Sequence, residues 1–215
     1  MPTVKKPPGR RRGEVTVDDL VGAAIDIVDR EGVDALTIRR VAEACGLSPM
    51  GVYRHVRDKD DLLDRVVDAV LGPGLRDLDA SGSWDQQVAD LFRHLRRLNL
   101  DHPGIAVLCV LRPTPVVGVA RFYARMLAAL AEGGFTGTDA VHAFDTLTMF
   151  MFGSVLWEIH RTPDTRERLV AVATGGEEAT QIIERARELS QRDPTEYFEA
   201  GLSTILDGLR ATRRT

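Results

Sequence analysis

The residues best suited to chemistry lie between positions 39 and 59, where basic side chains outnumber acids. The basic residues are Arg39, Arg40, Arg54, Arg57 and Lys59, and the acids are Glu43 and Asp58. Guanidinium and ammonium groups gathered on one face bind phosphate oxygens, and the attraction acts over a Debye length of roughly 8–10 Å. This local excess of positive charge predicts a nucleic-acid-binding surface in the segment.

The formal net charge of −4 hides an asymmetry along the chain. Residues 1–60 contain eleven Lys or Arg and ten Asp or Glu, whereas residues 61–215 contain seventeen and twenty-two. The first thirteen residues hold five basic side chains, Lys5, Lys6, Arg10, Arg11 and Arg12, and no acid. We expect residues 1–15, with their prolines and glycines, to form a flexible basic arm that contacts DNA. The alternative is a solvated tail without a role.

Patterns typical of catalysis or metal binding are absent from the sequence. The histidines, His55, His94, His102, His142 and His160, form no His-x-x-x-His pair and no cluster with cysteine. No Gly-rich phosphate loop and no nucleophile elbow is present. We therefore expect no enzymatic activity, no metal site and no cofactor.

Cysteine usage and hydropathy indicate the cellular compartment of the protein. Two cysteines, Cys45 and Cys109, make no disulfide framework in 215 residues and fit a reducing cytosol. No apolar segment follows the basic N-terminus as it would in a signal peptide. The most apolar stretch, residues 147–156, lies between Asp145 and Glu158 and is too short to cross a bilayer. We expect a cytoplasmic protein that does not interact with a membrane.

The elements that must position the basic segment are helices. Thr16 is a good N-cap for a helix that ends at Glu31-Gly32, and Thr37 caps a second helix that runs to about Ala44. Cys45-Gly46-Leu47 predicts a tight turn. Ser48 then caps a short helix, Pro49 to His55, with proline at its first position. Helix, glycine-containing turn and short helix together predict a helix-turn-helix.

The rest of the chain also predicts helices and no strand. Asp58 opens a helix that Gly72-Pro73-Gly74 interrupts or ends, which marks a hinge. Further helices are expected over residues 84–101, 105–111, 116–131, 138–159, 177–191 and 194–209. The predicted fold is all-α: a basic arm over 1–15, a three-helix helix-turn-helix domain over 16–62, and a larger helical ligand-binding and dimerisation domain over 63–215.

With these motifs in place, residues 16–63 resemble the N-terminal domain of the TetR family of repressors. The matching segments, in order, are Glu31-Gly32, Ala35 to Ala42, Gly46-Leu47-Ser48, Val52-Tyr53-Arg54-His55-Val56 and Lys59-Asp60-Asp61-Leu62-Leu63. One mild departure is Val56, where the family commonly has Phe. The remainder of the chain resembles the family's C-terminal domain in architecture only.

The resemblance implies a role for each exposed residue of the helix-turn-helix. Ser48, Pro49, Met50 and Gly51 would lie closest to base edges in the major groove, and Tyr53 and His55 would bond phosphates. Thr37, Arg39 or Arg40, and Lys59 would add backbone contacts. Arg54 has two possible roles, guanine recognition or phosphate binding. The alternatives are that Tyr53 packs internally, that His55 is structural, and that Arg39 and Arg40 form a solvated face.

The resemblance also implies a homodimer and a small-molecule effector. One helix-turn-helix contacts too few base pairs for specificity, so a two-fold dimer on a palindromic operator is expected, formed by helices near 138–160 and 194–210. The effector pocket would lie inside the second domain. Its candidate lining residues are Phe92, Leu95, Asn99, His102, Leu108, Arg112, Phe122, Met126, Phe144, Thr148, Met151 and Phe152.

Two alternatives remain for the pocket residues. The apolar side chains could instead form ordinary core, and His102 could instead cap the helix break at Pro103. Asn99, His102 and Arg112 are the stronger candidates because each is a polar group within or beside an apolar run, and a buried polar group needs a partner.

We expect the protein to be a ligand-responsive transcriptional repressor that binds double-stranded operator DNA. A small, largely hydrophobic effector would release it from the DNA. Effector binding would favour a form whose two recognition helices are wrongly spaced, and the fourth helix with the Gly72-Pro73-Gly74 region would transmit the shift. The alternative is an activator, or a DNA-binding regulator that has no effector.

Overall fold

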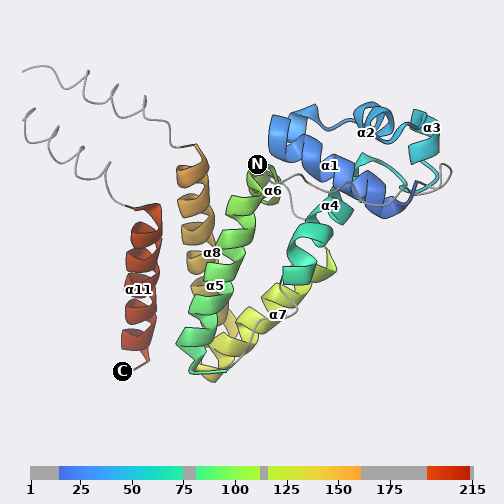
Figure 1. The fold of residues 1–215 in the computed structure, drawn as a ribbon. Coiled ribbons are helices and arrows are strands. Elements are labelled where there is room, and N and C mark those ends of the chain that lie inside the picture. Colours follow the sequence, from blue (N-terminus) through green and yellow to red (C-terminus); the bar gives the residue numbers. More distant parts are fainter. Residues whose placement is uncertain (1–14, 75–80, 112–115, 161–192, 214–215) are drawn as a thin grey trace, which may run out of the picture. The chain divides into compact units, whose positions relative to one another are not determined.

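A computed structural model describes residues 15–74, 81–111, 116–160 and 193–213. These residues are almost entirely helical and contain no strand (Figure 1). The helices are α1 (Val17–Glu31), the 3-10 turn η1 (Val33–Ala35), α2 (Ile38–Cys45), α3 (Pro49–Val52), α4 (Lys59–Gly74), α5 (Trp84–Asp101), α6 (Pro103–Leu111), α7 (Val117–Glu132), α8 (Gly137–Ile159) and α11 (Pro194–Thr212). The all-α prediction is confirmed.

The chain forms two compact units, residues 1–66 and 67–215, and the division falls inside α4. In the first unit α1 begins with a capping box. Thr16 accepts a hydrogen bond from the Asp19 amide at 3.2 Å, and the Asp19 carboxylate accepts one from the Thr16 amide at 2.9 Å. The core of this unit consists of the fully buried Leu20, Ala24, Val28, Leu36, Val41, Val52, Leu62 and Val66. These are apolar positions at helical spacing, so burial follows directly from the sequence pattern.

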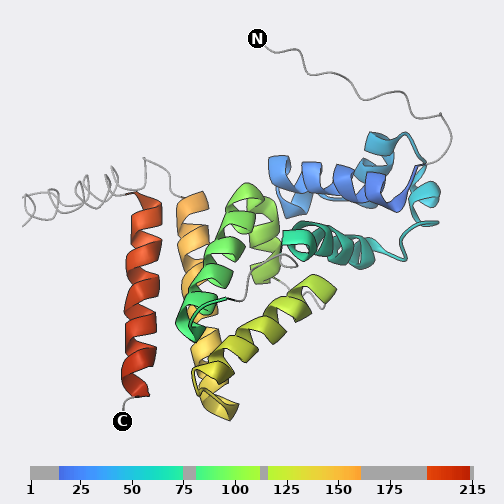
Figure 2. The ribbon, with the colours of Figure 1, turned by 60° about the horizontal axis from the view of Figure 1, so that its bottom comes forward.

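In the second unit α5, α8 and α11 lie side by side (Figures 1 and 2). Phe198 on α11 stacks on Phe150 of α8, with ring centroids 5.6 Å apart. The Arg96 guanidinium of α5 lies over the same Phe198 ring at 5.0 Å and also pairs with Glu158 of α8. One arginine thus contacts both neighbouring helices.

Helix boundaries agree with the sequence to within a few residues. Helix α6 begins at Pro103, two residues before the expected start, because proline suits the first turn of a helix. Helix α4 includes Pro73 and ends at Gly74. On α11 the third buried position is Leu206, while Ile205 and Leu209 are half-buried. The basic arm and the helix predicted over 177–191 lie outside the described residues, apart from residue 15 of the arm.

Candidate nucleic-acid interface and ligand pocket

The turn between α2 and α3 is fixed by local hydrogen bonds. Thr37 Oγ1 accepts from the Arg40 amide at 3.2 Å, and Ser48 Oγ accepts from the Gly51 amide at 3.2 Å. Gly46 ends α2 with φ +68°, a left-handed conformation that glycine adopts without steric cost. These caps confirm the predicted helix-turn-helix at the level of single residues.

Helix α3 is shorter than the sequence predicts. It is α-helical over Pro49–Val52, and residues 53–55 continue as turns in which the His55 amide donates to the Val52 carbonyl at 2.9 Å. A final turn with i to i−3 bonds is common at helix ends. The expected helix to His55 is therefore corrected to one α-helical turn followed by a tighter one.

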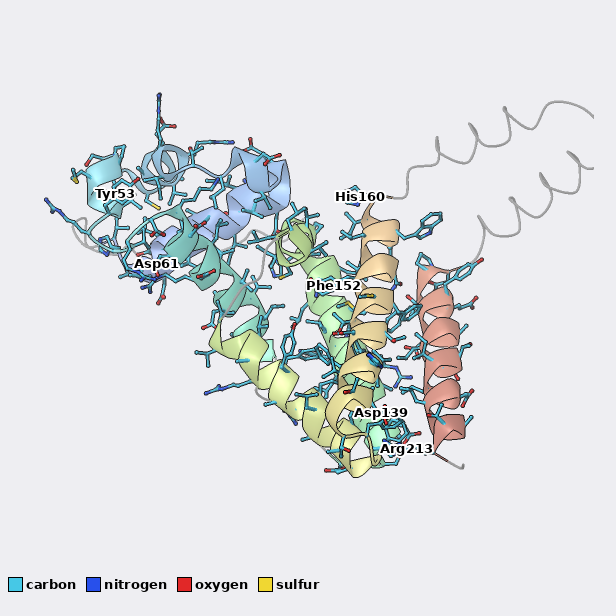
Figure 3. All side chains as sticks on the ribbon, turned by 180° about the vertical axis from the view of Figure 1, so that it is seen from behind. Tyr53, Asp61, Asp139, Phe152, His160 and Arg213 are labelled. Carbon is cyan, nitrogen blue, oxygen red and sulfur yellow. The ribbon has the colours of Figure 1, made fainter. Side chains whose placement is uncertain are left out.

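The outer surface of this segment is exposed and partly apolar. Met50 is 70% exposed and Tyr53 is 49% exposed, and Arg54 and Lys59 are also exposed. Within the described residues neither the Met50 side chain nor the Tyr53 side chain has a polar or ring partner. Val52 and Val56, by contrast, are buried and anchor the segment from below. Figure 3 shows Tyr53 just beyond α3. The segment thus holds its backbone rigidly while leaving large side chains free for a partner.

The two arginines of α2 differ in how far they are engaged. Arg40 forms an ion pair with Glu31 and donates to the Ala35 carbonyl at 3.4 Å. Its hydrogen bonds lower the pKa of the Glu31 carboxyl. Among the described residues Arg39 pairs only with Glu43, one turn along the same exposed face, at 2.8 Å. Because an exposed i to i+4 pair contributes little stability, Arg39 can change partners more readily than Arg40.

Sequence reasoning missed the contacts that fix the loop into α4. The Asp61 carboxylate accepts a hydrogen bond from the Arg57 amide at 2.9 Å, and the Asp61 amide donates to Asp58 Oδ1 at 2.7 Å. The Arg57 bond, with the nearby arginines, lowers the pKa of the Asp61 carboxyl. The Asp58-x-x-Asp61 spacing signalled the Asp58 cap, but nothing in the sequence singled out the return bond to Arg57.

In the second unit several of the predicted pocket residues form an aromatic cluster. Phe122 of α7 lies edge-on to Phe92 of α5 with centroids 5.8 Å apart, and 6.4 Å from Phe144 of α8. Tyr123 lies 4.6 Å from Phe144. Most of the other apolar candidates, Leu95, Leu108, Met126 and Met151, are buried, and Phe152 is half-buried (Figure 3).

Two polar candidates in this unit carry buried atoms without a partner. Asn99 is 1% exposed, and its amide nitrogen donates to the Leu95 carbonyl at 2.8 Å. Asn99 Oδ1 and Thr148 Oγ1 have no hydrogen bond within the described chain. His102 is half-buried and is the C-cap residue of α5, where its backbone amide donates to the Leu98 carbonyl at 3.1 Å. Arg112 lies outside the described residues.

A separate groove that the sequence did not predict runs between α5 and α11. Its volume is 440 Å³, and its walls carry Asp85, Arg93, Glu199 and Arg210. These charges pair with one another: Arg93 with Glu199 at 2.7 Å, and Arg210 with Asp85. The groove is therefore an electrostatically satisfied surface feature. Among the described residues no group of His, Cys, Asp and Glu is arranged to hold a metal ion.

Helix α8 is unusually apolar on its outer side. Val141, Met149 and Trp157 are exposed, and by length and composition alone the helix could cross a membrane. About 33% of its most apolar window is buried within the described chain. One helix of this kind is weak evidence for a membrane span, because a helix that is covered on several sides in a water-soluble protein meets the same criteria.

Comparison with known proteins gives matches along both units. The family model described as "Tetracyclin repressor-like, C-terminal domain" matches residues 78–213, and the one described as "Bacterial regulatory proteins, tetR family" matches residues 20–66. An HTH-type transcriptional regulator of Saccharopolyspora erythraea is 29% identical over 94% of this chain and 88% of its own length. The class A tetracycline repressor from transposon 1721 of Escherichia coli is 31% identical over 90% of each chain.

Solved structures agree with these matches. ActR of Streptomyces coelicolor in complex with actinorhodin superposes with a TM-score of 0.78 at 28% identity, covering 93% of this chain and 99% of that one. The same protein in complex with (S)-DNPA gives a TM-score of 0.77 at 28% identity, with the same coverage.

Proposed function

The chain belongs to the TetR family of bacterial regulatory proteins, and from this membership we propose that it is a repressor that leaves its operator DNA when a small molecule binds. The observation that carries the DNA-binding half is the segment after Ser48. Its backbone is capped and anchored, yet Met50 and Tyr53 project into solvent without partners in the described chain. Exposed apolar and polar side chains on a fixed helix are what base and phosphate contacts require.

In the proposed complex the first turn of α3 enters the major groove. Ser48, Pro49, Met50 and Gly51 face the bases, and Met50 supplies apolar contact to thymine methyl groups. Tyr53, His55, Lys59, Thr37 and Arg39 bind the phosphate backbone, and Arg54 contacts either a guanine or a phosphate. Arg40 contributes less than Arg39, since it is already held by Glu31 and the Ala35 carbonyl.

We further propose a homodimer built from α8 and α11 that binds a palindromic operator in the cytoplasm. Its support is the exposed apolar surface of α8, carried by Val141, Met149 and Trp157, together with Tyr197 of α11, which is also exposed. Several large apolar side chains exposed on neighbouring helices are typical of protein interfaces. A two-fold dimer would present two copies of α3 to successive turns of the duplex.

The proposed effector is small, largely hydrophobic and aromatic, and carries polar groups. The aromatic cluster of α5, α7 and α8 supplies flat walls, and Asn99 Oδ1 is a buried acceptor that a ligand donor would satisfy. ActR, with which this chain superposes well, is known in complex with actinorhodin. The relatives are named as transcriptional regulators, a non-enzymatic class, so no reaction is proposed.

A two-step experiment tests this function. Duplexes selected from a random pool by the full-length protein should converge on an inverted repeat and bind far more tightly than unrelated DNA in the same salt. Aromatic compounds, with actinorhodin and tetracycline as first probes, are then screened by thermal shift and by release of the selected duplex. Binding that is blind to sequence would overturn the proposed repressor. A specific operator that no stabilising compound releases would remove the effector half alone.

A further inference from the structure

Helix α7 lacks an N-terminal cap of its own. Its N-cap residue is Val116, which offers no side-chain hydrogen bond, and its first turn contains no acidic residue. The first amides of a helix have no partner inside the helix and favour a negative charge nearby. Thr16, Thr37, Ser48 and Asp193, by contrast, each cap their own helix through the side chain.

The missing cap comes from α4. The Gly118 amide, in the first turn of α7, donates to Asp68 Oδ1 at 2.7 Å. Asp68 precedes Gly118 by 50 residues, so one helix caps another. A hydrogen bond from a helix N-terminal amide to a carboxylate is charge-assisted, and it is roughly twice as strong as a hydrogen bond between neutral groups.

The two helices can meet this closely because residue 118 is a glycine. A Cβ added at position 118 would lie 2.7 Å from the Gly72 Cα and 2.9 Å from its amide nitrogen. Those are backbone atoms, which cannot rotate away as a flexible side chain could. Any side chain at 118 would therefore drive α7 away from α4 and lengthen the bond to Asp68.

The cap joins α7, which carries part of the aromatic cluster, to α4, the helix whose first residues belong to the first unit. One turn beyond Gly118 lies Phe122, the residue of α7 that contacts Phe92 and Phe144. In the other direction α4 runs without a break from Asp68 back to Lys59, about 14 Å at 1.5 Å per residue. At that end Asp61 ties α4 to the Arg57 amide, close to the recognition helix.

We propose that the Asp68–Gly118 cap is the joint through which effector binding and DNA binding influence each other. A ligand that displaces Phe122 shifts the first turn of α7. Because the Gly118 amide is bonded to Asp68, this shift strains or breaks the hydrogen bond to α4 and is not absorbed by side-chain rearrangement alone. By linkage, DNA binding that fixes α4 must also stabilise the first turn of α7. This inference rests on the proposed function and assigns the regulation to one hydrogen bond.

Hydrogen exchange with and without DNA tests the inference, and it requires no effector. Full-length protein is compared free and saturated with the duplex that it selects, and exchange is followed in peptides covering residues 116–126. In the wild type, DNA should slow exchange there by about fivefold or more, the lower end of usual coupling. In Asp68→Ala the slowing should fall below about twofold at saturating DNA. Asp68→Asn, which keeps the acceptor oxygen, should retain part of it.

The controls separate coupling from simple destabilisation. Asp139→Ala removes a carboxylate from the first turn of α8, so it should weaken that helix while leaving the DNA effect on residues 116–126 unchanged. Gly118→Ala should reproduce the loss seen in Asp68→Ala by a steric route. An equal DNA effect in the wild type and Asp68→Ala would overturn this inference and leave the repressor intact. If no specific duplex is selected, the proposed function fails, and this inference fails with it.

Discussion

The ring of Phe150 on α8 lies directly against the backbone of Gly201 on α11. A Cβ added at position 201 would fall 2.5 Å from Cε2 of that ring. Turning the ring away would break its stacking on Phe198. The absence of a side chain at one residue therefore sets the separation of the two helices that the proposed dimer uses.

Gly201→Ala should consequently destabilise the protein even though alanine favours helix. We expect a loss of about 1–3 kcal/mol in the free energy of unfolding, the usual cost of overpacking, measured by urea denaturation. Gly208→Ala on the same helix is the matched control, because a Cβ there meets nothing within 4 Å. It should gain about 0.5–1 kcal/mol from helix propensity. Equal effects of the two substitutions would contradict this account of the packing.

Tyr53→Ala should weaken operator binding without unfolding the protein. The Tyr53 side chain is about half exposed and has no partner in the described chain, so its removal changes the free energy of unfolding little. We expect a fall in affinity of about tenfold, within the range for one lost contact to nucleic acid, measured by fluorescence anisotropy at fixed salt. The control is Leu127→Ala, an exposed apolar residue on α7, which should leave operator affinity unchanged. Unchanged binding by Tyr53→Ala would argue against this surface as the DNA contact.

Asn99→Leu should separate ligand binding from stability. The side chain is buried, and its oxygen has no partner among the residues that the structure describes, so leucine removes a desolvated acceptor. The free energy of unfolding should stay constant or rise by about 1 kcal/mol, while the thermal shift given by any effector found in the screen should shrink. Asn99→Ala, which opens a cavity, should instead destabilise the protein. A full ligand response in Asn99→Leu would mean that the oxygen does not contact the effector.

Asp61 predicts a pH dependence at the acidic end. Its pKa is lowered in the folded protein, first by the Arg57 amide. A carboxyl with a lowered pKa stabilises the fold above its unfolded value, about 3.9, and loses that contribution as the pH falls through the folded value. Asp61→Asn should therefore cost about 1 kcal/mol at pH 7 and progressively less below pH 4. A cost that stays constant between pH 7 and pH 3 would disagree with this role; Asp34→Asn, at an exposed position, is the control.

Met149→Glu should weaken the proposed dimer. Met149 is 73% exposed at the centre of the apolar surface of α8, and a carboxylate there would be desolvated without a partner in the interface. Light scattering after gel filtration should show monomer at concentrations where the wild type is dimeric. Leu127→Glu changes an exposed leucine of α7 in the same way and should leave the mass unchanged. A wild-type chain that is itself monomeric would remove the basis for the dimer.

The sequence by itself determined most features that depend on neighbours three or four residues apart, although the Arg57–Asp61 bond is an exception. These features are local because each cap hydrogen bond closes within one turn of backbone. They are the helical periods, the left-handed Gly46, and the caps formed by Thr16, Thr37, Ser48 and Asp58. The same locality carried the family resemblance, whose motifs are these turns and caps. The aromatic pocket candidates were also identifiable as apolar positions. The sequence did not show which of these side chains contact one another.

Only the tertiary structure decided which distant residues meet. The Gly118 amide donates to Asp68, and the ring of Phe150 lies against Gly201. The Arg96 guanidinium donates to Glu158, 62 residues away. Such pairs depend on the register and crossing of helices, which many side chains set together. A glycine within a helix looks like a weak point in the sequence; only packing reveals that a second backbone or a ring occupies the space its side chain would fill.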